Sequence, residues 1–309
     1  MVEILMAIYN GARFLKEQLE SILGQTDPDW HLIIRDDGSQ DGTVDLIRTY
    51  EKKRPGQITL LCGEKPSGSA QNNFFELMKL ATQDWVMFCD QDDVWLPDKI
   101  AVTRARMEQA ESEWGRETPL LVHTDLQVVD DRLEVISPSF FQMQKLNPRR
   151  CAFHQLLVQN TITGCTAMIN RALLRLVRDN SPDIMMHDWW LGLIASCFGK
   201  VIPITQPTIL YRQHSGNAVG AGEQFDFQAV LKKVRGGAQI DKVLRRTLAQ
   251  GRAFLAQYGD EMSPENRFLL EQYLSLEEEK NKLKRIGLLI RHDFWKHSLI
   301  RRLGQIYKI

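Results

Sequence analysis

The chain has 309 residues, of which 43% are hydrophobic and 25% are charged, as in a globular protein of one large or two modest domains. Its 39 Lys and Arg residues balance its 39 Asp and Glu residues, which argues against binding nucleic acid over the whole surface. Five scattered cysteines without CxxC spacing favour a reducing compartment over disulfides or a zinc site. Without a signal-peptide pattern or an apolar run of about 18 residues, we expect a cytoplasmic protein.

The first 110 residues alternate between strand-like and helix-like segments. Buried strands are expected at residues 3–9, 30–34, 58–61 and 85–89. Helices are expected at residues 12–23, 43–53, 70–81 and after Pro97. This alternation favours an α/β fold with a Rossmann-like, mostly parallel central sheet that is flanked by helices on both faces.

The rest of the chain follows a different pattern. Further strands are expected at residues 120–124, 163–169, 201–204 and 209–212, and helices at 149–159, 171–178 and 185–198. From about residue 225 to the end the chain reads as almost wholly helical. We therefore expect an α/β domain over residues 1–220 and a helical C-terminal extension over residues 221–309.

Polar clusters follow three of the expected strands, namely Tyr9-Asn10, Asp36-Asp37 and Asp90-Gln91-Asp92-Asp93. Ligands of parallel sheets bind at the carboxyl ends of the strands, so we expect the three clusters to face one ligand. Asp90 and Asp92 are two residues apart and can point the same way toward one Mg²⁺ or Mn²⁺ ion. The alternative is a solvated acidic loop that caps the next helix.

Other candidate residues have two interpretations each. A carboxylate at Asp36 can accept from a base imide or from ribose hydroxyls, or it can shape an Asx turn. Asp188, beside Trp189 and Trp190, is a candidate general base, or the N-cap of a helix with two core tryptophans. His214 can ligate a metal or contact a phosphate, or remain solvated. Gly164 can allow a close backbone approach to a ligand, or form a strand bulge.

The order of these motifs resembles family 2 glycosyltransferases of the GT-A fold. The resemblance covers about residues 2–220 and is carried by residues 6–11, 35–43 and 89–93, together with Gly164, His187-Asp188 and His214. Residues 90–95, 187–190 and 211–220 look most like bacterial rhamnosyltransferases of cell-surface polysaccharide synthesis. One departure is His187, where many members of the family carry glutamate.

The resemblance implies a role for each motif. Residues on the donor side would be Ala7, Tyr9, Asn10, Asp36, Asp37, Asp90, Gln91 and Gly164, with Ala7, Tyr9 and Asp36 at the base. Asp92 and His214 would hold Mg²⁺ or Mn²⁺ on the diphosphate of a nucleoside diphosphate sugar. Asp188 would deprotonate the acceptor in an inverting displacement, and His187, Trp189 and Trp190 would lie on the acceptor side.

The expected donor is dTDP-β-L-rhamnose, with UDP-sugars as an alternative, and the expected acceptor is a glycan or a lipid-linked glycan. A nucleotidyltransferase that makes nucleotide sugars would share the sheet and the carboxylates. It should, however, carry a Gly-rich, basic phosphate loop after the first strand, which Tyr9-Asn10-Gly11 is not. A catalytically silent nucleotide-sugar-binding protein is a third hypothesis, which an intact Asp92 and Asp188 disfavour.

The C-terminal region is basic and amphipathic. Residues 221–309 carry 17 Lys and Arg against 11 Asp and Glu, and from Lys280 onward the count is nine against one. From Leu283 to Ile309 apolar residues recur at helical spacing among these basic residues. Such a helix can lie peripherally on the inner face of an anionic membrane, or it can pack on the catalytic core or a second subunit. The sequence leaves these choices open.

Overall fold

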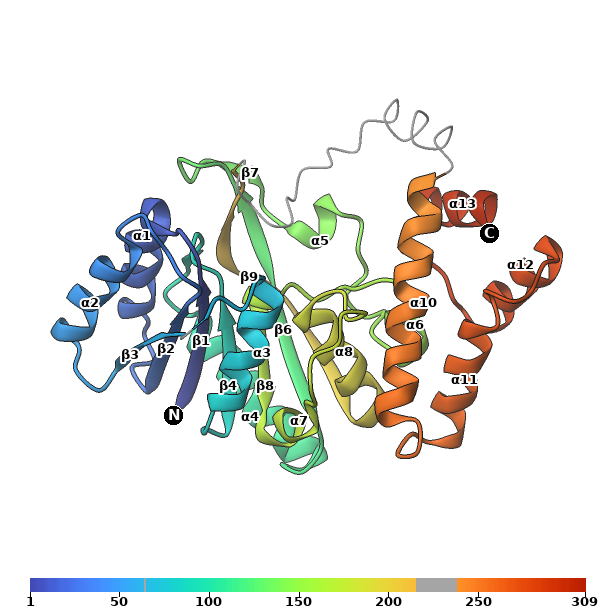
Figure 1. The fold of residues 1–309 in the computed structure, drawn as a ribbon, viewed down its shortest axis with the longest axis horizontal. Coiled ribbons are helices and arrows are strands. Elements are labelled where there is room, and N and C mark those ends of the chain that lie inside the picture. Colours follow the sequence, from blue (N-terminus) through green and yellow to red (C-terminus); the bar gives the residue numbers. More distant parts are fainter. Residues whose placement is uncertain (64, 215–237) are drawn as a thin grey trace.

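The computed structural model describes residues 1–63, 65–214 and 238–309 of the chain (Figure 1). The alternation expected for the first 110 residues is confirmed. The strands are β1 (Val2–Ile8), β2 (Trp30–Asp36), β3 (Ile58–Cys62) and β4 (Trp85–Cys89). The helices are α1 (Ala12–Leu23), α2 (Thr43–Lys53), α3 (Ala70–Leu80) and α4 (Lys99–Trp114).

One mixed sheet of nine strands organises the molecule. The later strands are β5 (Val94–Trp95), β6 (Leu120–Val129), β7 (Val135–Ser137), β8 (Ala167–Asn170) and β9 (Lys200–Arg212). The order is β3-β2-β1-β4-β8-β6-β9-β5, and β7 pairs with β6. Strands β1 to β4 are parallel, as expected, and so are β6 and β9. The antiparallel strand β8 joins the two parallel groups.

The second half of the chain departs from the expected boundaries. The helix expected at residues 149–159 is the single turn α6 (Phe153–Leu156), and residues 164–166 form a 3₁₀ turn before β8. The two strands expected at 201–204 and 209–212 are one strand, β9. The register of β6 shifts around Asp125, opposite Pro207, which lets β9 continue past a proline. The remaining short helices are α5 (Phe140–Met143) and α7 (Arg171–Leu176).

The C-terminal helices share a hydrophobic core with the sheet. Helix α8 (His187–Phe198) lies beside α10 (Ala238–Tyr258), and α11 (Pro264–Leu274), α12 (Lys282–Arg291) and α13 (Leu299–Lys308) follow outside them (Figure 1). The Trp190 ring lies 5.2 Å from that of Phe254 and 6.1 Å from that of Tyr258. Such aromatic burial fixes α10 against the α/β core. None of the described helices has the length and hydrophobicity that crossing a membrane requires.

The basic tail is two helices and not one. The chain turns between α12 and α13, where Asp293 and Ser298 have φ values of 52° and 62°. Arg150 holds this turn through two hydrogen bonds of 3.0 and 3.2 Å to the Asp293 carboxylate. The inner side of the tail packs on the core through Leu289 and Phe294, which are fully buried.

Candidate active site

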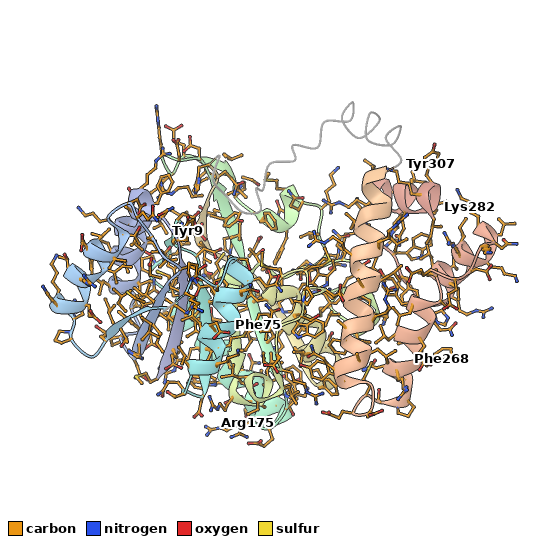
Figure 2. The ribbon with its side chains drawn as sticks, viewed as in Figure 1. Tyr9, Phe75, Arg175, Phe268, Lys282 and Tyr307 are labelled. Atoms are coloured by element: carbon orange, nitrogen blue, oxygen red, sulfur yellow. The ribbon has the colours of Figure 1, made fainter. Side chains whose placement is uncertain are left out.

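Three parallel strands deliver polar residues to one edge of the sheet. The register pairs Met6 with Cys89 and Ile8 with Asp36, so β1, β2 and β4 end at nearly the same level. The segments that follow them therefore meet at the carboxyl edge, as their sequence pattern predicts. Tyr9 comes directly after β1 and exposes its ring to solvent at this edge (Figure 2).

The Gln91 amide joins the ends of β1 and β4. Its Nε2 donates to the carbonyl of Tyr9 at 3.1 Å, and its Oε1 accepts from the Tyr9 amide at 2.9 Å. A Cβ atom on Gly11 would lie 2.7 Å from this Oε1, so a larger residue there would displace the Gln91 amide from the contact. Asn10 extends the link to the loop after β2. Its backbone N–H donates to Ser39 Oγ, and its side-chain Oδ1 accepts from the backbone N–H of Gln40.

Asp36 and Asp37 have different surroundings. Asp36 Oδ2 accepts from the amides of Gly38 and Ser39 at 3.0 Å, while its buried Oδ1 has no hydrogen-bond partner in the described structure. Both oxygens of Asp37 are occupied by protein donors, including Arg35 and the Gly68 amide. Although burial opposes it, these bonds hold the pKa of Asp37 below its ordinary value. Of the two carboxylates, Asp36 can therefore still accept a hydrogen bond from a ligand. Ala7, in the neighbouring strand β1, lies beside Asp36 and is partly buried.

Asp90 is close enough to two other acids of the site to be affected by their charges. Burial first, and then the charges of Asp92 and Asp188, raise its pKa to about 7. Asp92 belongs to the loop after β4 and Asp188 to the start of α8, so two acidic segments far apart in sequence converge on Asp90. Such mutual repulsion favours binding of a cation or a proton.

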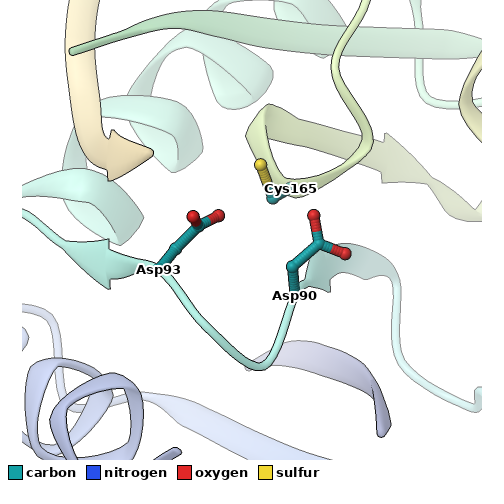
Figure 3. A group of neighbouring side chains, drawn as sticks. All are labelled: Asp90, Asp93 and Cys165. Carbon is teal, nitrogen blue, oxygen red and sulfur yellow. The ribbon is translucent and has the colours of Figure 1, made fainter. Parts of the chain in front are cut away.

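Asp93 and Cys165 complete a compact group with Asp90 (Figure 3). One ligand atom of each residue lies within 4.8 Å of the others. Asp93 Oδ1 accepts from the Arg212 amide at 3.0 Å, whereas Oδ2 is buried without a hydrogen-bond partner among the described residues. Burial, together with the charges of Asp92 and Asp90, raises the pKa of Asp93 well above its ordinary value.

A buried lysine lies near this group. Lys99 is fully buried, and its Nζ lies 4.7 Å from the Trp95 ring centroid. Burial lowers the pKa of Lys99 to about 8, while Cys165, Cys89 and Asp93 act in the opposite direction. The ammonium therefore supplies positive charge beneath the acidic loop. Neither Lys99 nor the group of Asp93 and Cys165 was expected from the sequence.

Asp92 and His214 meet across the site. His214 Nε2 lies 2.8 Å from Asp92 Oδ2, although 122 positions separate the two residues. The Phe14 ring lies 4.8 Å from the imidazole and supports it. A carboxylate and an imidazole are suitable ligands for Mn²⁺ and, through the carboxylate, for Mg²⁺.

Arg212 anchors this part of the site and was missed in the sequence. Its buried guanidinium donates to the carbonyl of Asp92 at 2.8 Å and to the carbonyl of Asp131 at 2.7 Å, and it pairs with Glu17. The same residue binds Asp93 through its amide. The only signal in the sequence was an arginine at the end of an expected strand, two positions before His214.

Asp188 occupies the first turn of α8. Its Oδ1 accepts from the Trp189 amide at 2.5 Å and from Asn160 Nδ2 at 3.3 Å, and Gly164 also donates its amide. Burial nevertheless raises the pKa of Asp188 to about 7, which suits a general base at neutral pH. Gly164 is needed here for space, because a Cβ atom would lie 2.7 Å from His187 Nε2.

His187 and Trp190, which were expected on the acceptor side, are both buried. His187 is buried, its ring centroid lies 4.0 Å from that of Phe74 and 5.2 Å from that of Phe88, and its nitrogens have no partner among the described residues. Trp190 is fully buried in the core. Helix α8 therefore turns both side chains into the protein interior. Trp189 is only partly buried, and its indole donates to the Leu156 carbonyl at 2.6 Å.

The burial of His187 predicts a pH-dependent cost in stability. Desolvation lowers the pKa of the imidazole from 6.5 to about 3, so the unfolded chain takes up the proton first as the pH falls. His187 then destabilises the fold by about 1.4 kcal/mol per pH unit below about pH 6.5, and not above it. The variant His187→Phe, whose ring suits the site between Phe74 and Phe88, should lose this dependence.

Urea unfolding of the wild type and of His187→Phe at several values between about pH 5 and 7.5 gives the free energy of unfolding of each protein. The effect is the change with pH in the difference between the two free energies. The difference removes the contribution of groups common to both proteins, such as Asp90 and Asp188. Their raised pKa values act with the opposite sign, because the folded protein holds the extra protons. Parallel stability curves for the two proteins would contradict the prediction.

Known proteins match both the sequence and the fold. The family model described as glycosyl transferase family 2 matches residues 3–176. The dTDP-rhamnosyl transferase RfbG of Shigella flexneri is 30% identical over 240 residues, covering 74% of this chain and 78% of RfbG. TarS 1–349 of S. aureus, in complex with UDP-GlcNAc, aligns with a TM-score of 0.59 and 14% identity over 94% of this chain and 72% of that one.

The mannosyltransferase PcManGT of Pyrobaculum calidifontis, in complex with GDP-Man and Mn²⁺, aligns with a TM-score of 0.50 and 18% identity over 99% of this chain and 83% of that one. The architecture is therefore that of the GT-A glycosyltransferases, as the resemblance predicted. Since the family model spans more than half of its residues, the chain belongs to glycosyl transferase family 2.

Proposed function

We propose that this protein is an inverting glycosyltransferase that extends a bacterial cell-surface polysaccharide or lipid-linked glycan, with dTDP-β-L-rhamnose as donor. The observation that carries the proposal is the convergence of Asp92 and Asp188 on Asp90 at the carboxyl edge of the sheet. It gives this edge of the sheet a carboxylate for a divalent cation that would hold a diphosphate, and a base for an acceptor. The rhamnose donor is supported by the similarity to RfbG.

The donor side has a specific acceptor atom for a nucleobase. Asp36 Oδ1 is buried and without a protein partner, so an imide N–H of thymine or uracil would satisfy it. Tyr9 exposes its ring nearby and offers a surface for stacking a base. Because both bases carry this imide, a UDP-sugar is the second candidate, and the complex of TarS with UDP-GlcNAc favours it.

The residues at the site fit a divalent cation. Asp92 and His214 would hold Mg²⁺ or Mn²⁺, and Asp90 would contact the ribose or the ion. The partnerless Asp93 Oδ2 is a further carboxylate oxygen at this place. When bound, such an ion neutralises the charge of a departing nucleoside diphosphate.

Asp188 performs the proton transfer in this proposal. The acceptor hydroxyl attacks the anomeric carbon as its proton passes to the Asp188 carboxylate, and the bond from that carbon to the diphosphate oxygen breaks. Attack from the face opposite the leaving group inverts the anomeric centre and gives an α-linked rhamnoside. The amides of Gly164 and Trp189 and the side chain of Asn160 orient the carboxylate.

A donor panel tests the function. The protein is incubated with Mn²⁺ and dTDP-rhamnose, UDP-glucose, UDP-galactose or UDP-N-acetylglucosamine, and slow hydrolysis and binding are measured. We expect dTDP-rhamnose to be bound and hydrolysed best, with release of dTDP. If the protein prefers a UDP-sugar, the donor is that UDP-sugar and not dTDP-rhamnose. Release of pyrophosphate from a nucleoside triphosphate would indicate a nucleotidyltransferase instead.

A further inference from the structure

The helices α12 and α13 expose a set of hydrophobic side chains. Leu283 and Ile290 of α12 are 78% and 65% exposed, and Leu299, Leu303 and Tyr307 of α13 are 72%, 58% and 61% exposed. A spacing of four or seven residues places each set on one side of its helix. We call these five residues the terminal apolar patch.

The two helices of the patch are joined at their ends. Lys282 Nζ donates to the carbonyl of Tyr307 at 2.9 Å and lies 5.7 Å from the centroid of its ring. Leu283, the next residue, is thereby brought beside the C-terminal end of α13. Both helices lie at one end of the molecule, outside α10, where Figure 2 labels Lys282 and Tyr307.

The two helices that carry the patch are basic. Helices α12 and α13 contain seven Lys and Arg residues and no Asp or Glu. The nearest acids in sequence are Glu279, which lies 3.9 Å from Lys284, and Asp293, which is paired with Arg150 at 3.0 Å. Lys282, Arg285 and Arg302 each donate to a backbone carbonyl, and a carbonyl does not cancel their charge. The patch therefore lies on two helices whose charged residues are all basic.

We propose that the terminal apolar patch docks on the surface of an anionic phospholipid bilayer. Its leucines and isoleucine would enter the boundary between head groups and acyl chains, Tyr307 would lie at the head-group level, and the basic side chains would contact lipid phosphates. A second copy of the chain fits this surface less well, because it would bring two strongly basic regions together.

The role of membrane docking in glycan transfer rests on the proposed function, whereas the docking itself does not depend on that function. In the view of Figure 1, α13 lies on the upper side of the molecule, which is the side toward which β1 and β6 run. Docking would then keep the edge that carries Asp188 near a membrane, where a lipid-linked glycan acceptor resides. Docking would thereby raise the local concentration of a membrane-bound acceptor at the active site.

Vesicle co-sedimentation of the full chain tests the proposal. We expect binding to vesicles of phosphatidylglycerol and phosphatidylethanolamine, weak binding to phosphatidylcholine alone, and loss of binding at high salt. The double variant Leu299→Ser/Leu303→Ser should bind the anionic vesicles about tenfold less. The matched control is Val135→Ser/Ile136→Ser, which removes two similarly exposed side chains from β7 and should bind as the wild type does.

Failure of the wild type to bind anionic vesicles, or equal binding by the α13 variant, would overturn the proposal. A concentration-dependent dimer that the α13 variant abolishes, without vesicle binding, would assign the patch to a second copy. Donor hydrolysis by the same proteins separates the two proposals. Vesicle binding without sugar turnover contradicts only the proposed function, and turnover without vesicle binding contradicts only the docking surface.

Discussion

Replacing Asp188 with asparagine is expected to lower sugar transfer about 10²–10⁴-fold, with donor affinity nearly unchanged. The amide keeps the size of the side chain but cannot accept the proton of the acceptor hydroxyl. Asp188 lies at the start of α8 and not among the residues assigned to the donor. Release of nucleoside diphosphate in the presence of acceptor measures transfer, and calorimetry with the donor measures affinity.

The pH profile of the wild type provides a second readout of the same residue. Since burial raises the pKa of Asp188 to about 7, its carboxylate form increases as the pH rises through that value. The kcat/KM for transfer should therefore rise across about pH 7, and the residual activity of Asp188→Asn should lack this step. Near wild-type turnover by the variant would exclude Asp188 as the base.

Replacing Asp92 with alanine is expected to remove the metal dependence of donor binding. The variant loses the carboxylate that faces His214, and with it one of the two side chains assigned to the ion. Donor affinity in the presence of Mn²⁺ should fall to the value that the wild type shows without metal. Calorimetric titration of the donor with and without Mn²⁺ measures both proteins.

The matched control for Asp92→Ala is Asp84→Ala. Asp84 is an exposed acid just before β4, at the opposite end of the strand that precedes Asp92, so its loss tests a change of charge alone. The control should keep the full response to Mn²⁺. If the wild type itself binds the donor equally with and without Mn²⁺, the assignment of a metal to Asp92 and His214 is wrong.

The sequence predicted best what depends on local pattern. The parallel strands and their helices follow from periodicity, and the convergence of Asp36 and Asp90 on one edge follows from parallel topology. The meeting of Asp92 with His214 was predicted only through the resemblance to a family, because 122 positions of chain separate them. No local pattern fixes a contact of that kind.

The sequence did not predict which polar residues of the site are buried. His187 was expected on the acceptor side only through the resemblance to the family, and its ring packs against Phe74 and Phe88. Lys99 gave no signal and Arg212 only its place at the end of an expected strand, since a basic residue in a sequence is expected at the surface. Which way such a residue points depends on the carboxylates and rings that other segments supply.

The Gln91 contact with Tyr9 has a consequence for the substrate-free protein between turnovers. Asp90, Asp92 and Asp93 stand within four residues, and their like charges push the loop apart when no substrate neutralises them. An uncharged amide that holds both backbone groups of Tyr9 opposes this repulsion without adding a charge. The loop can therefore keep its shape through a change in occupancy, and little ordering remains to be done when the next sugar nucleotide arrives.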